Sequence, residues 1–170
     1  MARALGGALD HPVLELDSVH HQPDWEPLPE AEFRGRLLAF LDANDRWIVD
    51  GNYTSHGVAE LVWPRADTIV WMDPPRSVVM AQVLQRTLVR GVRRRELWNG
   101  NVEDWRSMFR TDPEENIVLW AWTTFDRNRR RYESRLESDE WRHLVVHRIR
   151  SRAEATRLVS DSRSGDQWSG

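Results

Sequence analysis

The stretch WIVDGNY, residues 47–53, constrains the fold more than any other part of the sequence. Its apolar run, 47–49, predicts a buried strand that ends at Asp50. Gly51 and Asn52 follow, and both residue types tolerate the backbone angles of a tight turn. In α/β enzymes, polar chemistry lies beyond the carboxyl ends of the strands. We therefore expect a phosphate group or a metal ion to face Asp50.

Three further apolar runs are predicted strands. They cover residues 13–16, 67–72 and 143–149, and Asp17 and Asp73 stand at the ends of the first two. The spacing of apolar residues and prolines predicts helices over residues 2–10, 29–43, 57–62, 76–90, 114–136 and 152–160. This alternation is typical of an α/β fold with a parallel sheet covered by helices on both faces. Because the strands are apolar runs, three of the four should be buried on both sides.

The length of 170 residues is enough for one domain with its own core. We expect a single domain over residues 1–160 and a polar tail without fixed structure over 161–170. Residues 91–112 lack a steady hydrophobic period and contain Gly91 and the Asn-Gly-Asn of 99–101. This stretch is predicted to be a mobile lid.

The composition excludes several classes of protein. The chain contains no cysteine, which excludes disulfides and thiolate metal sites. No apolar run approaches the ~20 residues that cross a bilayer, and residues 1–7 are too short and weakly apolar for a signal peptide. We therefore expect a cytoplasmic protein without a membrane partner.

Charge is distributed unevenly along the chain. Residues 1–60 hold 11 acidic residues and 4 arginines, a balance of −7, whereas residues 86–110 hold 7 arginines and 3 acidic residues, a balance of +4. All 24 basic residues are arginines, so the chain contains no lysine. An acidic half beside a basic stretch suits a site that holds an anion together with a cation.

Asp17 and Asp50 are the strongest candidates for chemistry, since carboxylates near a phosphate hold Mg²⁺ directly or through water. The alternative is that each forms only a turn or a helix cap. We interpret Asp73, which precedes two prolines, as a cap and chain reversal. His20 and His21 are a weak signal for a zinc site.

Arginines near the lid are candidates for phosphate binding, because guanidinium groups bind phosphate oxygens in pairs. A solvated helix face is an equally good interpretation of the run. The candidates are Arg86, Arg90, Arg93, Arg94 and Arg95, with one residue, Arg131, from the later cluster 127–131. Trp25 and Trp98 are predicted to lie in loops, where either could line a pocket.

Several segments together resemble an adenylate-kinase-like P-loop family, whose bacterial members are often labelled topology modulation proteins. They are ELDSVHHQPDW, WIVDGNY, RADTIVWMDPPR, RTLVRGVRRRELWNGN and RNRRRY. The resemblance covers residues 2–150 and implies a three-layer parallel sheet with a small lid. It also implies a nucleotide-binding phosphotransferase that uses ATP and Mg²⁺, with an unknown small-molecule acceptor.

The resemblance assigns roles to the candidates. Asp50 would lie near Mg²⁺, and Asp17 would face the acceptor or a metal-bound water. The basic candidates would close over the phosphoryl group, and the substrate would contact Asn52, Tyr53, Trp25 and Trp98. Asn52 departs from the adenylate kinase pattern, which argues against AMP as the acceptor.

One part of the family pattern is absent. Members begin with a strand and a G-x-x-x-x-G-K-[ST] loop, which binds phosphates through its backbone N–H groups and its lysine. This chain has no such loop and no lysine. It therefore resembles a member without its central first strand and phosphate loop, either from a misassigned start codon or as a truncated pseudoenzyme. ATP should bind poorly to it, and the chain as given should be inactive as a phosphotransferase.

Two alternatives remain open at this point: a non-catalytic binding or regulatory module on the same fold, and nucleic-acid binding through the arginines, which the acidic net charge disfavours. The missing strand also predicts a divided sheet. Strand 13–16 should pair with 47–50, and strand 67–72 with 143–149, leaving unpaired edges that could favour self-association.

Overall fold

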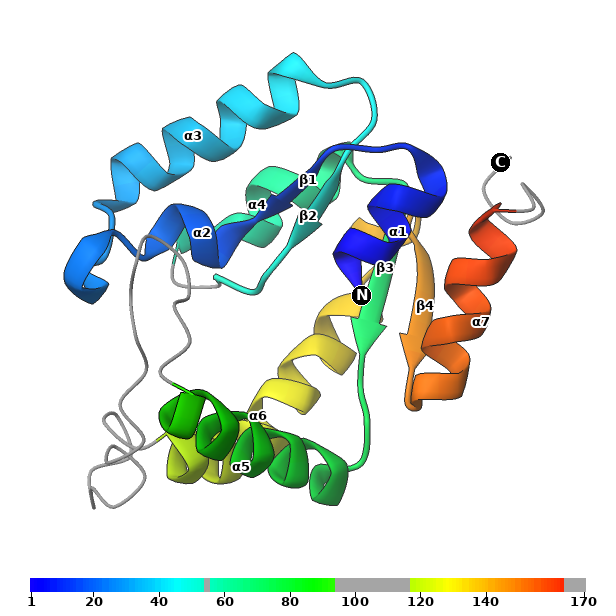
Figure 1. Cartoon of the computed structure of the whole chain (residues 1–170). Helices are drawn as coiled ribbons and strands as arrows, with labels where there is room; N and C mark the ends of the chain where they lie inside the picture. Colours follow the sequence, from blue (N-terminus) through cyan, green and yellow to red (C-terminus); the bar gives the residue numbers. More distant parts are fainter. Residues whose placement is uncertain (54–55, 94–116, 164–170) are drawn as a thin grey trace. The chain divides into compact units, whose positions relative to one another are not determined.

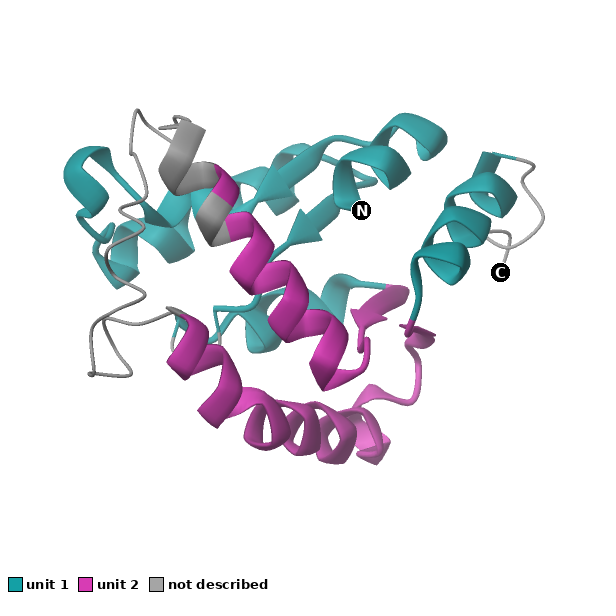
Figure 2. Ribbon diagram, turned by 60° about the horizontal axis from the view of Figure 1, so that its bottom comes forward, with its two compact units in different colours: residues 1–66, 151–170 teal, residues 67–150 magenta. Residues whose placement is uncertain are grey.

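The computed structural model of the chain describes residues 1–53, 56–93 and 117–163 (Figure 1). The chain divides into two compact units, which are described separately (Figure 2). The first combines residues 1–66 with 151–170, and the second covers 67–150. The architecture is mixed α/β. The expectation of one domain over residues 1–160 stays a prediction.

The first unit contains the following elements in chain order: α1 (Ala2–Leu9), β1 (Val13–Glu15), α2 (Leu16–His20), the 3₁₀ helix η1 (Pro23–Trp25), α3 (Glu30–Ala43), β2 (Ile48–Asp50), α4 (Val58–Val62), the 3₁₀ helix η3 (Trp63–Arg65) and α7 (Arg152–Arg163). β1 and β2 form a parallel pair in which Val13 lies opposite Ile48 and Glu15 opposite Asp50. Leu16, Phe33 and Leu37 are its most completely buried large side chains.

Gly51 explains the turn that follows β2. Its φ of 136° lies in a region that side-chain-bearing residues rarely adopt. A Cβ at this position would also stand 2.8 Å from Cβ of Leu16. Glycine therefore allows the chain to leave β2 in close contact with the start of α2.

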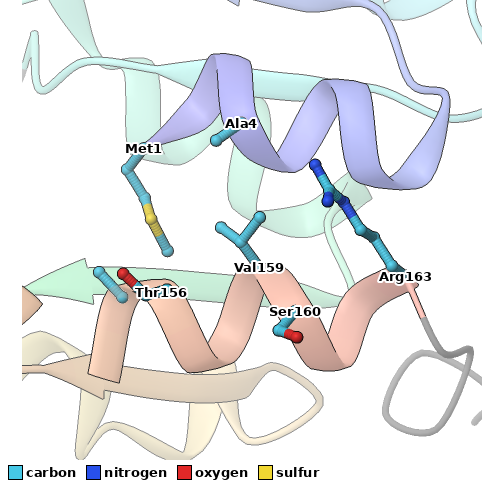
Figure 3. A pocket seen from close by; sticks show the side chains of 7 residues that line it. Met1, Ala4, Thr156, Val159, Ser160 and Arg163 are labelled. Carbon is cyan, nitrogen blue, oxygen red and sulfur yellow. The ribbon is translucent and has the colours of Figure 1, made fainter. Parts of the chain in front are cut away.

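A hollow of about 440 Å³ lies between α1 and α7, and Figure 3 shows the side chains that line it. Most of this lining is small or apolar, and it comprises Met1, Ala4, Ala155, Thr156, Val159, Ser160 and Arg163. None of the predicted site residues is among them.

The second unit contains β3 (Thr68–Met72), α5 (Arg76–Arg93), α6 (Ile117–Leu136), the 3₁₀ helix η6 (Asp139–Trp141) and β4 (Val145–Ile149). β3 and β4 are parallel and pair along their full length, from Thr68 opposite Val145 to Met72 opposite Ile149. Helices α5 and α6 pack against each other.

Both predicted strand pairs are therefore confirmed. Within the described ranges no ladder joins the two pairs, which agrees with the expectation of a divided sheet. The prediction that most strands are buried on both sides is wrong. Met72 is 49% exposed and Val145 is 55% exposed, because in a two-stranded sheet every strand is an edge strand.

Three predicted boundaries also need correction. β1 ends at Glu15, and Asp17 lies in the first turn of α2 rather than at the end of a strand. α5 continues to Arg93, so the first residues of the predicted lid are helical, and the rest of 91–112 lies outside the described residues. α7 continues to Arg163, three residues into the predicted tail.

Candidate functional site

The carboxyl ends of β1 and β2 bring acidic residues together in the first unit. Glu15 and Asp50 are opposite each other in the parallel ladder, so their side chains leave the same face of the pair. Asp17 follows two residues after Glu15, in the first turn of α2. The two predicted carboxylates thus come from different elements, Asp50 from the end of β2 and Asp17 from the start of α2 after β1.

Arg3 of α1 binds the first of these acids. Its Nε and Nη2 donate to the two carboxylate oxygens of Glu15, at 2.5 and 2.7 Å. This bidentate pairing raises the pKa of Arg3. Glu15 is thereby neutralised, and the sequence analysis did not identify it. Aligning the two strands in parallel would have revealed it opposite Asp50.

The carboxyl group of Asp50 has a raised pKa. Desolvation by the surrounding atoms raises its pKa, and the negative charges of Glu15 and Asp17 raise it further, whereas the Met1 ammonium group and Arg3 lower it. The side chain stays exposed to solvent. Within the described residues, no arginine hydrogen bond to Asp50 is found. Asp50 is therefore a solvent-accessible acid whose charge is incompletely balanced.

Tyr53 connects the β2 turn to Asp17. Its hydroxyl donates to Oδ1 of Asp17 at 2.7 Å, and Nε2 of His21 lies 3.5 Å from the same hydroxyl. Burial and the hydrogen bond to Asp17 raise the pKa of Tyr53 well above its ordinary value. Tyr53 therefore stays protonated and keeps Asp17 in a fixed orientation.

Aromatic and imidazole rings pack behind this hydrogen bond. The ring centroid of His20 lies 4.6 Å from that of Tyr53 and 5.0 Å from that of His56. The ring centroid of Phe33 lies 4.8 Å from that of His56. We call these rings the ring group: His20, Phe33, Tyr53 and His56. Burial lowers the pKa of His20, and the neighbouring His21 and His56 lower it further, so its imidazole is held neutral.

Trp25 extends the ring group to the surface. Its ring centroid lies 5.1 Å from that of His21 in an edge-to-face arrangement, and the residue is 38% exposed. Asp24 and Trp25 both have positive φ angles, 62° and 61°, although neither is glycine. The predicted substrate residues Trp25 and Tyr53 thus belong to one group with Asp17. Asn52 is exposed on the turn between β2 and Tyr53.

The basic candidates belong to the second unit. Arg86 is exposed on α5, and Arg131 is exposed on α6. Arg90 and Arg93 lie on α5, and only their backbone belongs to the described part of the structure. Arg94, Arg95 and Trp98 lie outside the described residues. Their predicted roles in phosphate and substrate binding therefore stay predictions.

The interpretation of Asp73 as a helix cap is wrong. Its side chain is only 5% exposed, and Arg148 of β4 donates to its Oδ2 through Nε at 2.8 Å. Arg129 of α6 and Arg150 approach it at 3.5 and 3.9 Å. Asp73 is therefore a buried ionic centre that links β3, β4 and α6. Sequence reasoning missed it because Arg148 is 75 residues away.

Glu15, Asp17 and Asp50 form an acidic edge at the carboxyl ends of β1 and β2. Its residues can be compared with the known kinds of metal site. The described residues contain no group of three or more His, Asp or Glu side chains arranged to hold a metal ion. A resident metal enclosed by protein ligands, including zinc on His20 and His21, is not supported by this geometry. Mg²⁺, however, is commonly bound by one or two carboxylates together with water and substrate phosphates. Asp50 and Asp17 suit that shared arrangement.

The chain matches no protein family model, and no significant match was found among curated proteins or solved structures. A search of the described helices for one long and apolar enough to cross a membrane found none.

Proposed function

We propose that this protein is a phosphotransferase of the adenylate-kinase-like P-loop lineage. The observation that carries this proposal is the incompletely balanced Asp50 at the carboxyl edge of a parallel strand pair, next to Glu15 and Asp17. Strand ends of this kind are where open α/β sheets bind ligands.

The strand pairing supports the same lineage. The two observed pairs, β1 with β2 and β3 with β4, are those expected when a central strand stands between β2 and β3. The three-layer arrangement itself belongs to the proposal.

In this function Asp50 and Asp17 would hold Mg²⁺ together with phosphate oxygens of the substrate. When bound, the cation would neutralise phosphate charge at the transferring group. The protein's own contribution is positioning: Arg3 neutralises Glu15, and Tyr53 orients Asp17. The Tyr53 contact orients Asp17 before any ligand arrives.

ATP does not fit the residues of this chain, because the sequence contains neither a glycine-rich phosphate loop nor a lysine. We therefore expect calorimetry with Mg-ATP to show no micromolar binding. Clear micromolar binding would mean that another group of residues binds the phosphates.

The experiment that tests the proposal is a titration with Mn²⁺, a paramagnetic substitute for Mg²⁺, followed by water proton relaxation. In the presence of inorganic phosphate, the unmodified chain should bind Mn²⁺ more tightly than Asp50→Asn or Asp17→Asn. Asp45→Asn is the matched control, since Asp45 is an exposed aspartate just before β2.

Equal Mn²⁺ affinity in Asp50→Asn, Asp45→Asn and the unmodified chain would contradict the proposal. The carboxylates would then belong to a solvated turn that has no role in metal binding.

A further inference from the structure

We propose that the group formed by Trp25, His21, Tyr53 and Asp17 binds an uncharged, hydroxylated ring compound, which stacks on Trp25 and directs a hydroxyl group toward Asp17. The inference rests on the proposed function and names the substrate class for the same site. Four side chains carry it, in the contact order Trp25, His21, Tyr53 and Asp17.

Charge is the first argument. A phosphate-bearing acceptor requires arginine or lysine donors, because its dianion must be neutralised. Among the described residues, Arg34 contacts the ring group: its Nη1 donates to the backbone oxygen of His56 at 3.1 Å and lies 3.9 Å from Glu30. Asp17 and Asp50 add negative charge nearby. Within the described residues, this charge favours a neutral ligand over an anion.

The backbone around Trp25 is the second argument. Two consecutive non-glycine residues, Asp24 and Trp25, lie in the left-handed region, which side-chain-bearing residues rarely adopt. Backbone hydrogen bonds maintain this conformation: Gln22 N–H donates to Glu26 at 2.8 Å, and Leu28 N–H donates to His20 at 2.8 Å. The strained turn holds an exposed indole beside His21. Indole faces stack on planar rings and on the apolar faces of sugars.

The polar atoms of the group are the third argument. Nδ1 of His20 is buried and has no hydrogen-bond partner. Unsatisfied buried polar atoms are rare in folded proteins and call for an explanation. An imidazole can donate or accept according to its tautomer, which suits a hydroxyl group better than a fixed charge. A hydroxylated ligand that reaches the ring group would satisfy His20.

Asp17 completes the recognition of a hydroxyl group. Its Oδ1 accepts from Tyr53, so its orientation is fixed, and the ionised carboxylate can only accept hydrogen bonds. A ligand hydroxyl, unlike a phosphate, supplies the required donor.

The test is an NMR titration of the chain labelled at the imidazole carbons of histidine. The probes are two matched pairs, adenosine with AMP and glucose with glucose 6-phosphate, which separate a nucleoside acceptor from a sugar acceptor. At least one neutral probe should shift the signals of His20 and His21. Its phosphorylated partner should bind at least about tenfold more weakly, a difference of about 1.4 kcal/mol.

Two variants localise the binding. Trp25→Ala should abolish the shifts caused by the neutral probe. Trp120→Ala, which removes an indole that is 46% exposed on α6, should leave them unchanged. Equal losses in the two variants would overturn the assignment to Trp25.

The remaining outcomes are also decisive. Tighter binding of a phosphorylated probe, or no histidine shift with any of the four probes, would overturn the proposed acceptor class. The Mn²⁺ titration separates this failure from failure of the function itself. A chain that binds Mn²⁺ but no probe contradicts the acceptor class alone. A chain that binds a neutral probe but not Mn²⁺ contradicts the phosphotransferase.

Discussion

The two strand pairs end in opposite electrostatic states. At the β3–β4 edge, Asp73 and Glu133 are matched by three arginines, Arg129, Arg148 and Arg150. The Arg148 guanidinium also lies 4.3 Å above the Trp71 ring. At the β1–β2 edge, Arg3 binds Glu15, Tyr53 binds Asp17, and Asp50 interacts with the charges of Arg3 and the Met1 ammonium group.

The difference separates a carboxylate that supports the fold from one available to a ligand. Asp73 is buried, and its charge is balanced from both neighbouring elements, which is how a protein keeps an ionised group inside. Asp50 is exposed, and its pKa is raised, so its ionised form is less favoured than that of an ordinary aspartate. Both residues stand at the carboxyl end of a β-strand. The groups that contact each carboxylate, rather than its place in the chain, therefore distinguish the two residues.

The largest effect expected from this comparison is on stability at the β3–β4 edge. Asp73→Asn should destabilise the protein by about 3 kcal/mol, because it leaves the partly buried Arg148 without its main acceptor. Urea denaturation followed by circular dichroism measures the change.

The control for this change is Asp126→Asn. Asp126 accepts from Arg76 at 3.2 Å, but its side chain is mostly exposed, so the loss should stay below about 1 kcal/mol. If the two variants are equally stable, Asp73 is not a structural centre and the comparison fails.

The next effect concerns the backbone that shapes the β1–β2 edge. Gly51→Ala should cost about 1–3 kcal/mol, since the new Cβ would combine a strained φ with a 2.8 Å approach to Leu16. Thermal denaturation provides the measurement.

Gly35→Ala is the matched substitution. Gly35 lies within α3 with open space around its Cα, and alanine there should raise stability by about 0.5–1 kcal/mol. A gain in stability in both variants would show that the turn after β2 does not require glycine.

The sequence predicted the four strands and most of the longer helices, because apolar runs and helical periodicity are local signals. The pairing of the strands came instead from the resemblance to the adenylate-kinase-like family. The resemblance also named Asp17, Tyr53 and Trp25 as site residues; the structure joins them through His21, and their roles stay predictions.

Long-range contacts were the part that sequence reasoning missed. The role of Asp73 depends on Arg148 and Arg129, which come from later elements. Glu15 could be recognised only from its register with Asp50. The partial exposure of the strands followed from the two-stranded sheets, whereas an apolar run by itself indicates full burial.

A smaller effect should appear as pH dependence at the ring group. The lowered pKa of His20 means that, below about pH 6.5, the unfolded chain binds a proton there more readily than the folded chain. Stability should therefore fall as the pH decreases from that value. The groups facing His20 are His21, His56 and Asp17, and Asp17 opposes the shift. Urea midpoints measured across this range should depend less on pH in His20→Gln.

His143→Gln is the control for the pH experiment, because His143 is exposed in the second unit. It should keep the full pH dependence of the unmodified chain. Loss of the dependence in His143→Gln, with none lost in His20→Gln, would assign it to a different histidine.

The smallest expected change in stability is also the one that most directly separates the two edges. The raised pKa of Asp50 means that its ionised form is disfavoured in the folded state, so stability is lost as the pH rises through that pKa. At neutral pH, Asp50→Asn should therefore raise the urea midpoint slightly while it weakens Mn²⁺ binding. Below about pH 3.8 the two proteins should be equally stable, since the carboxyl group is then protonated in both states. Asp45→Asn should change neither quantity. A lower midpoint for Asp50→Asn at neutral pH would place Asp50 with Asp73, as a residue that stabilises the fold rather than one available to a ligand.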